Sequence, residues 1–159
     1  MEIIEAQPQH FIEIEALIQK VWLPTYTHYA DYQQIVYMQN EMYNLASLLQ
    51  QSVEGHTFYV ALEYQRVIGF VSFYVQGDLV KVPKLYVDHS IHQKGVGKLL
   101  LKSVEKYAKD NNLIAIELNV NRYNKALYFY RRYGFYIHAS VDVPLKEFWL
   151  NDYVLRLDL

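Results

Sequence analysis

The chain has 159 residues, 52% of them hydrophobic, which is enough to bury the core of one globular domain. A formal net charge of -2 at pH 7 excludes a strongly basic surface of the kind that recruits nucleic acid or an anionic membrane. The absence of cysteine excludes disulfides, thiolate zinc sites and a cysteine nucleophile, and it fits a reducing compartment.

The start of the chain argues against export. Four glutamates lie between residues 2 and 15, where a secretory signal needs a basic start and an unbroken apolar stretch. The longest mostly apolar run, residues 67–75, is far shorter than the roughly twenty residues that a membrane-spanning helix needs. We therefore expect a single cytoplasmic domain over residues 1–159, with no membrane partner and no nucleic-acid partner.

The first third of the chain predicts a short strand and then helices. Residues 2–6 have the pattern of a strand, and Pro8 opens a helix that Pro24 should end. Residues 32–51 predict one or two further helices, and Gly55 is a typical stop after them. The apolar stripe expected on this second helical region consists of Ile35, Met38, Met42, Leu45 and Leu49.

Three strands should follow, over residues 57–63, 66–75 and 79–87. The connections between them are so short that consecutive strands must form antiparallel hairpins. The alternation of strands and helices continues from there to the end of the chain. It predicts one α/β unit without a linker.

A helix of about four turns is predicted after Gly95, because apolar and lysine side chains recur on opposite faces at helical spacing. The apolar positions are Val96, Leu99, Leu100, Val104, Tyr107 and Ala108, and the lysines are Lys98, Lys102, Lys106 and Lys109. We interpret the lysine face as solvated. A strand over 113–120, a helix over 123–133 that Gly134 ends, and strands over 135–143 and 148–157 complete the prediction.

The segment around the start of this helix predicts an anion site. The first N–H groups of a helix have no partner within the helix, and the helix dipole makes this end positive. Gly95 and Gly97 let main-chain amides approach an oxygen cluster, and Lys94 and Lys98 add cations, so a pyrophosphate fits well. An ordinary strand-to-helix turn is the alternative, because the GxG pattern alone is weak.

Two segments together resemble the GCN5-related N-acetyltransferase (GNAT) superfamily. HQKGVG at residues 92–97 is similar to the pyrophosphate loop of that family. The second signature is matched by Asn124, Ala126, Tyr130, Gly134 and Phe135. The order of predicted elements matches as well, so the resemblance spans nearly the whole chain. It implies an α/β (α+β) fold with a central mixed, mostly antiparallel twisted sheet flanked by helices, and a splayed strand pair that holds acetyl-CoA.

The resemblance also implies a role for individual residues. The cradle for the pyrophosphate of acetyl-CoA would consist of His92, Gln93, Lys94, Gly95, Val96, Gly97 and Lys98. The strand at Leu85, Tyr86 and Val87 would pair its main chain with the pantetheine arm. Asn124 would bond the pantetheine or phosphate region, and Tyr130 would face the sulfur and protonate the leaving thiolate.

Two positions depart from the family pattern. His92 stands where the family usually has Gln or Arg, which changes little if main-chain N–H groups hold the phosphates. Asn124 is two residues before Ala126 instead of three, so Asn121 could share or take its role. A helix N-cap is the other role open to either asparagine.

The implied reaction is the direct attack of an acceptor amine on the thioester. The N–H of Val87 is our candidate for polarising the thioester oxygen. The proton of the amine would pass to Glu63, Asp88 or Glu117 through a water molecule, or to water alone. Tyr130 is the predicted catalytic residue, and the sequence does not choose among the proton acceptors.

The acceptor is expected to be a small amine. Many of the 16 tyrosines lie between residues 26 and 43. This region and the ending from Trp149 are similar to small-molecule acetyltransferases, including polyamine acetyltransferases. An aromatic and acidic pocket would bind an amine through cation–π contacts and carboxylate pairing. The alternatives are a peptide or protein N-acetyltransferase and a non-catalytic acetyl-CoA-binding module.

Two further features of the sequence bear on metals and assembly. His89 and His92 are three residues apart, but no carboxylate or cysteine nearby completes a ligand set, so we expect no metal site. The many aromatic residues and the apolar ending over 148–159 suggest a homodimer formed through a sheet edge or face.

Overall fold

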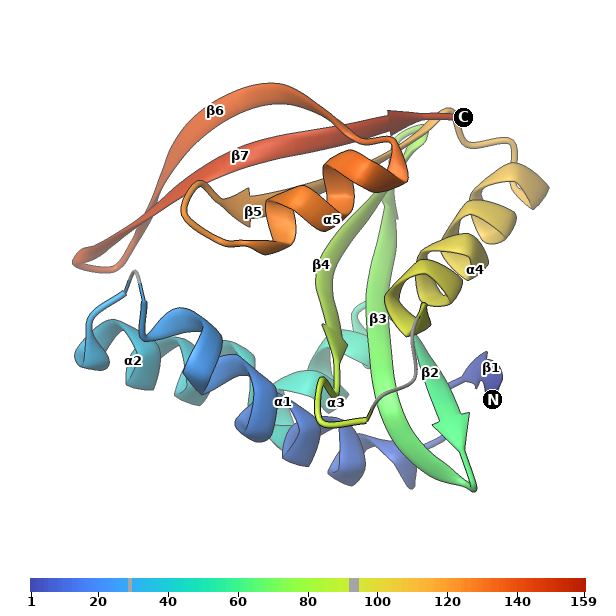
Figure 1. The fold of residues 1–159 in the computed structure, drawn as a ribbon, viewed down its shortest axis with the longest axis horizontal. Coiled ribbons are helices and arrows are strands. Elements are labelled where there is room, and N and C mark those ends of the chain that lie inside the picture. Colours follow the sequence, from blue (N-terminus) through green and yellow to red (C-terminus); the bar gives the residue numbers. More distant parts are fainter. Residues whose placement is uncertain (29, 92–94) are drawn as a thin grey trace.

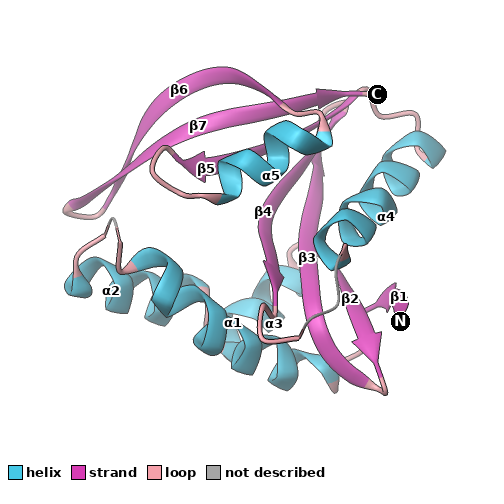
Figure 2. Ribbon diagram, in the orientation of Figure 1, coloured by secondary structure: helices cyan, strands magenta, loops and turns pink. Residues whose placement is uncertain are grey.

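The computed structural model describes residues 1–28, 30–91 and 95–159, which form a mixed sheet with helices on both faces (Figures 1 and 2). The seven strands lie in the order β1-β2-β3-β4-β5-β7-β6. The strands are β1 (Glu2–Glu5), β2 (Thr57–Glu63), β3 (Arg66–Gln76), β4 (Leu79–Val87), β5 (Ala115–Asn121), β6 (Tyr136–Leu145) and β7 (Phe148–Asp158). The helices are α1 (His10–Tyr26), α2 (Tyr32–Met42), α3 (Leu45–Val53), α4 (Val96–Asp110) and α5 (Ala126–Tyr133).

The centre of the sheet is splayed between β4 and β5. These two strands are parallel and pair only where Leu79, Val80 and Lys81 face residues 115–117. Beyond these residues the two strands diverge, so that β4 continues beside β3 while β5 continues beside β7 (Figure 1). The other strand pairs are antiparallel, which confirms the mixed, mostly antiparallel sheet and its splayed pair.

Two hydrophobic cores cover the two faces of the sheet. The first lies under α4 and α5 and includes Leu100, Val104 and Tyr130, which are all buried. The second lies under α1, α2 and α3 and includes Ile14 and Trp22. No helix among the described residues is long and apolar enough to cross a membrane.

The prediction that Pro24 ends the first helix is wrong by two residues. Helix α1 continues through Pro24 to Tyr26, and the Thr27 hydroxyl then donates to the Pro24 carbonyl oxygen at 3.1 Å. Proline lacks one N–H and crowds the turn before it, but it does not restrict the residues after it. The last turn can therefore form.

Two leucines that were placed on apolar stripes are exposed. Leu49 is 39% exposed, and Leu48 is buried instead. The reason is that α2 and α3 are separate helices: Asn44 caps the start of α3, so the apolar face of α3 does not continue the face of α2. Leu99 is 43% exposed, and Leu101 takes the core position. Strand β5 begins two residues later than predicted, and α5 three residues later.

Gly69 keeps α4 close to the sheet, and its replacement by alanine should destabilise the fold. A Cβ atom on Gly69 would lie 3.0 Å from Cγ1 of Val96 and 3.2 Å from the carbonyl oxygen of Tyr86. The carbonyl cannot move without disturbing the sheet, so we expect Gly69→Ala to cost about 1 to 3 kcal/mol of stability in urea denaturation.

Ser72→Ala, on the same strand, is the matched control. Ser72 is fully buried, and its hydroxyl has no hydrogen-bond partner in the part of the chain that the structure describes. Removal of that hydroxyl should leave the free energy of unfolding unchanged or increase it. A Gly69→Ala protein as stable as the wild type would contradict the close approach of α4.

Candidate active site

The end of β4 directs main-chain polar groups into the splay. Val87 lies opposite Gly69 on β3, and the N–H of Asp88 donates to the carbonyl oxygen of Ile68 at 2.9 Å. This pattern makes Val87 and Gly69 a non-hydrogen-bonded pair, so the N–H and C=O of Val87 point away from β3. By the same alternation, those of Leu85 point the same way. Both residues therefore offer hydrogen bonds on the side from which β5 has departed.

Tyr86 is oriented differently from its two neighbours. It lies opposite Phe70 in the hydrogen-bonding position of the ladder, so its main-chain groups face β3. Its side chain lies against the core under α1, α2 and α3, where its hydroxyl is close to those of Tyr26 and Tyr43. Of the three β4 residues expected at the cofactor, Leu85 and Val87 therefore direct main-chain groups into the splay. Tyr86 does not, and its phenol lies in the core under α1, α2 and α3.

The first turn of α4 lies against both β4 and α5. Gly95 has φ +89°, in the left-handed region that glycine adopts readily, and its carbonyl oxygen accepts the first helical bond, from Leu99. A Cβ atom on Gly97 would lie 3.2 Å from the ring of Phe129 and 3.7 Å from Cγ2 of Val87. Glycine at residue 97 therefore lets the helix start meet the end of β4 and the face of α5.

The expected cradle is only partly within the described residues. His92, Gln93 and Lys94 lie outside them. Val96 is buried in the core under α4, whereas Lys98 is exposed beside the helix start. The N–H groups of the first turn, which have no partner within the helix, and the Lys98 ammonium together provide a positive end next to the splay.

Tyr130 lies on α5 with its ring in the core. The ring makes edge contacts with Phe129 and Phe135, at centroid distances of 5.2 and 5.7 Å. Within the part of the chain that is described, no hydrogen bond involves the Tyr130 hydroxyl. Burial, reinforced by the nearby Tyr26 phenol, raises the pKa of Tyr130 well above its ordinary value. The side chain is therefore a neutral hydroxyl that can donate a hydrogen bond at any physiological pH.

The two asparagines before α5 both form local turns. The Asn124 Oδ1 atom accepts from the N–H of Ala126 at 2.9 Å, and the Asn121 Oδ1 atom accepts from the N–H of Tyr123 at 2.9 Å. The N-cap position of α5 is occupied by Lys125, so neither asparagine is the helix N-cap. Asn121 also lines the neighbouring cavity.

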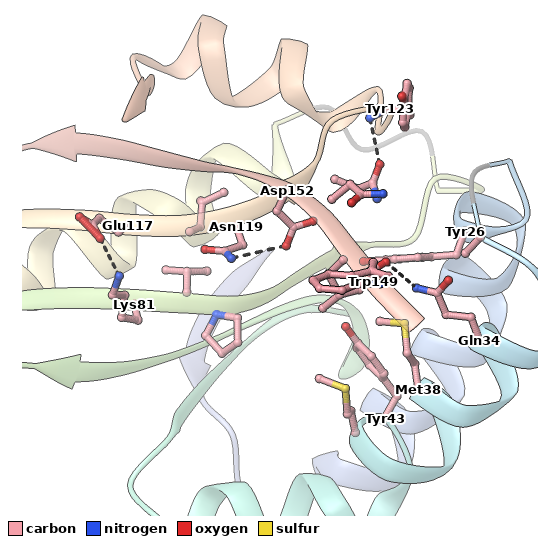
Figure 3. Close-up of a pocket in the computed structure, with 18 of the residues that line it drawn as sticks. Tyr26, Gln34, Met38, Tyr43, Lys81, Glu117, Asn119, Tyr123, Trp149 and Asp152 are labelled. Atoms are coloured by element: carbon pink, nitrogen blue, oxygen red, sulfur yellow. Dashed lines mark hydrogen bonds and ion pairs between the residues drawn. The ribbon is translucent and has the colours of Figure 1, made fainter. Parts of the chain in front are cut away.

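A cavity of about 370 Å³ lies on the side of the splay away from α4 (Figure 3). It is lined by α1 and α2, by the separated strands β4 and β5, and by β7. Tyr26 comes from α1, Gln34 comes from α2, and Tyr43 directly follows α2, while Trp149 and Asp152 come from β7. The tip of the β6–β7 hairpin meets α2, where Gln34 Nε2 donates to the Trp149 carbonyl oxygen at 3.4 Å.

Two of the tyrosines that line this cavity, Tyr26 and Tyr43, are linked through the phenol of Tyr86. The hydroxyls of Tyr26 and Tyr86 are 3.4 Å apart, and Tyr86 donates to Tyr43 at 3.4 Å. Burial raises the pKa of Tyr43 and of Tyr86 well above the ordinary value, so both remain neutral. Lys84 lies behind them, with Nζ 4.9 Å from the centre of the Tyr43 ring, and burial lowers its pKa to about 8.

The three carboxylates expected as proton acceptors are in different places. Glu63 is the last residue of β2, and the strands β3 and β4 lie between β2 and β5. Asp88 follows β4 and accepts from Lys20 Nζ at 2.8 Å. Burial would raise the pKa of Asp88, but the hydrogen bonds from Lys20 and Ser90 outweigh it and lower the pKa.

Glu117 is the carboxylate of this group that lines the cavity. Its oxygens accept from Lys81 at 2.6 Å and from Arg156 at 3.3 Å. Burial would raise the pKa of Glu117, but the Lys81 hydrogen bond and the charge of Arg156 outweigh it and lower the pKa. Glu117 is therefore a stable anion in a salt-bridge network and a weak base.

Asp152 is a cavity residue that the sequence analysis missed. It lies in the middle of β7, 7% exposed, and burial raises the pKa of its carboxyl group. The sequence did contain a signal for it. Residues 150, 152 and 154 lie on the same face of the strand, and Leu150 and Val154 are apolar. A carboxylate at an apolar position of a strand is uncommon unless it has a partner or a function.

The fold is shared by solved structures of low sequence identity. The PaiA N-acetyltransferase from Thermoplasma acidophilum in complex with coenzyme A superposes with a TM-score of 0.86 at 22% identity, over 99% of this chain and 98% of that one. The ribosomal-protein-S18-alanine N-acetyltransferase from Escherichia coli gives 0.75 at 14% identity, over 99% and 92%. A GNAT family acetyltransferase from Elizabethkingia anophelis with acetyl-CoA bound gives 0.58 at 21%, over 70% and 82%.

Sequence comparison identifies the family. No curated protein sequence matches the chain. The family model that describes the acetyltransferase (GNAT) domain matches residues 26–147, which is most of the chain and includes the splay, the start of α4 and all of α5. The protein therefore belongs to the GNAT family and is an acetyltransferase.

Proposed function

We propose that the protein transfers the acetyl group of acetyl-CoA directly to the amine of a small molecule. The observation that carries this proposal is the separation of β4 and β5 beyond Lys81 and Glu117. On one side of this opening lies a positive helix start, and on the other lies an aromatic and acidic cavity. A thioester that enters from the first side would meet an amine that enters from the second.

Acetyl-CoA is the co-substrate, and the residues around the splay suit its parts. The α4 N–H groups and Lys98 would bind the pyrophosphate, which is the anion that a helix start favours. Leu85 and Val87 would pair their main chain with the amides of the pantetheine arm. Asn124 would contribute its amide to the same arm. The neighbours that contain coenzyme A or acetyl-CoA support this use of the fold.

In the reaction, the nitrogen of the neutral amine would form a bond to the thioester carbon, and the carbon–sulfur bond would break. The Val87 N–H would donate to the oxygen as it gains negative charge. Tyr130 would donate its proton to the leaving thiolate and would regain one from the attacking nitrogen, which becomes positively charged when it bonds to the carbon and must lose a proton to form the amide. An alkylammonium must first lose a proton, which costs about 4.6 kcal/mol at pH 7. That proton would leave by a water molecule beside Glu117 or by bulk water.

The cavity favours a small cationic acceptor over a peptide chain. Its volume of about 370 Å³ is that of a pocket for a small molecule. Its wall combines phenol rings with the Asp152 carboxylate, which attracts an ammonium group, whereas the charge of Glu117 is paired with Lys81 and Arg156. A polyamine or a related small amine fits this combination.

A panel of acceptors tests the proposed function. The purified protein is incubated with acetyl-CoA and a thiol-detecting reagent, together with polyamines, amino acids, aminoglycosides or peptides. We expect coenzyme A release with polyamines and little with peptides. Release with peptides alone would show a peptide N-acetyltransferase, and binding of acetyl-CoA without release would show a binding module.

We further propose that the protein acts in the cytoplasm as a homodimer. Strand β6 is an edge of the sheet, and Tyr136, Ile137 and Val143 on it are exposed. An apolar edge strand is a common pairing surface. Light scattering at micromolar concentration should give the mass of two chains, and the mass of one chain would rule out the dimer.

A further inference from the structure

The carboxylate of Asp152 is aimed into the cavity and has almost no protein partner. Its Oδ2 atom accepts a long hydrogen bond of 3.4 Å from Asn119 Nδ2, and the residue is 7% exposed (Figure 3). Removing a carboxylate from water costs several kcal/mol unless a cation or several hydrogen bonds compensate. One long bond from a neutral amide is weak compensation, so the group is suited to a cation that comes from outside.

The cations nearest to Asp152 are engaged elsewhere. Arg122 donates to Asp142 at 2.7 Å and to the main-chain oxygen of Asp152 at 3.3 Å, and its charge favours the Asp152 carboxylate without outweighing burial. Lys81 pairs with Glu117 at 2.6 Å. Within residues 1–28, 30–91 and 95–159, the Asp152 carboxylate thus forms no salt bridge.

Aromatic rings complete a site for a cation. Tyr26, Tyr43 and Trp149 line the same cavity as Asp152. Ring faces attract ammonium groups, and the attraction grows where water is excluded. The electrostatic influence of Asp152 contributes to the raised pKa of Tyr43, after burial and Tyr26, so the carboxylate and this ring share one environment.

Asp152 and the proposed acid Tyr130 lie in different surroundings. Asp152 and Tyr26 line the cavity, whereas Tyr130 is buried in the core under α4 and α5. An acceptor whose reacting amine lies near Tyr130 would therefore need a second group, at some distance from the first, to reach the carboxylate.

We infer that Asp152 selects acceptors with two positive charges by binding the second, non-reacting ammonium group. This inference rests on the proposed function, because it concerns the acceptor of the same reaction. Asp152 then determines which acceptors bind well. A monoamine would lack the contact with Asp152, but its amino group could still react with the thioester. The enzyme should prefer diamines and longer polyamines to monoamines of equal carbon length.

Putrescine and butylamine are matched probes, because they share a four-carbon chain and differ by one ammonium group. We expect the wild type to use putrescine with a kcat/KM at least about tenfold above that for butylamine. Asp152→Asn should lower the value for putrescine by about tenfold or more and change that for butylamine by less than about threefold. Asp158→Asn, the same change on the exposed end of β7, should leave the ratio unchanged.

A binding measurement separates the failure of this inference from the failure of the proposed function. In the presence of coenzyme A, putrescine should raise the Tm of the wild type and not that of Asp152→Asn. If no amine is acetylated but this difference persists, the proposed function fails and the Asp152 site stands. The inference is overturned if putrescine is acetylated and Asp152→Asn keeps the wild-type preference for putrescine. It is also overturned if Asp152→Asn lowers kcat/KM for putrescine and for butylamine by the same factor.

The Tm of the variant without any acceptor excludes a structural explanation. The folded protein raises the pKa of Asp152, so its ionised form destabilises the fold at neutral pH, and stability is gained as the pH falls toward the unfolded value. Asp152→Asn should therefore have an equal or higher Tm than the wild type at pH 7. A large fall in Tm would assign Asp152 to the structure instead of to the acceptor.

Discussion

Replacing Tyr130 by phenylalanine should lower kcat by about tenfold or more, while the Kd for acetyl-CoA changes by less than about threefold. The substitution removes only the hydroxyl, and the ring keeps its contacts with Phe129 and Phe135. Because burial keeps the phenol neutral, it can donate to a developing thiolate, and this donation is strongest when the negative charge has formed on the sulfur. Steady-state kinetics with the best acceptor measures the first quantity, and calorimetry measures the second.

Tyr133→Phe is the matched control for this prediction. Tyr133 is on the same helix, and its hydroxyl donates to Glu105 on α4, away from the splay. The Tyr133→Phe enzyme should keep kcat within about twofold of the wild-type value. It should lose at most about 1 kcal/mol of stability, the amount typical of one hydrogen bond. A Tyr130→Phe enzyme with normal kcat and a lowered Tm would show that Tyr130 is only a core residue.

Replacing Gly97 by glutamate should weaken acetyl-CoA binding by at least about tenfold. Residue 97 lies in the first turn of α4, where the free N–H groups favour an anion. A carboxylate there would oppose the pyrophosphate, and the side chain would also press on Phe129, since even a Cβ atom would lie 3.2 Å from that ring. Calorimetric titration with acetyl-CoA gives the affinity.

Gly97→Ala separates the two causes. It adds the contact with Phe129 without the charge, so we expect its affinity to fall by less than about threefold. If alanine weakens binding as much as glutamate does, packing between α4 and α5 is the reason for the glycine. Unchanged affinity in Gly97→Glu would contradict the placement of the pyrophosphate at this helix start.

The sequence predicted the elements of this fold because their signals are local. Strand alternation, helical period and the stops at Gly55 and Gly134 each depend on a few neighbouring residues, and all of these elements are present. The errors arose where the local rule was incomplete. Pro24 restricts the turn before it and not the two residues after it, and the break at Asn44 changes the phase of the apolar stripe.

The site was predictable only in part, for a related reason. The glycines near the start of α4 and Tyr130 on α5 belong to continuous motifs. Asp152 and Asn119 are far apart in the chain and meet because β7 inserts between β5 and β6. This order depends on long-range pairing, which no local pattern specifies, so the acceptor side of the cavity emerges only from the folded structure.

We propose that an acetyl group passes at the splay from acetyl-CoA to an amine in the adjoining cavity. The most direct measurement is the ratio of coenzyme A released to acetylamine formed by the wild-type protein with putrescine, using a thiol reagent and mass spectrometry in one reaction. We predict a ratio of about one, with no release when the amine is omitted, as direct transfer requires. Release of coenzyme A without an acetylated amine, or no release with any amine, would contradict the claim.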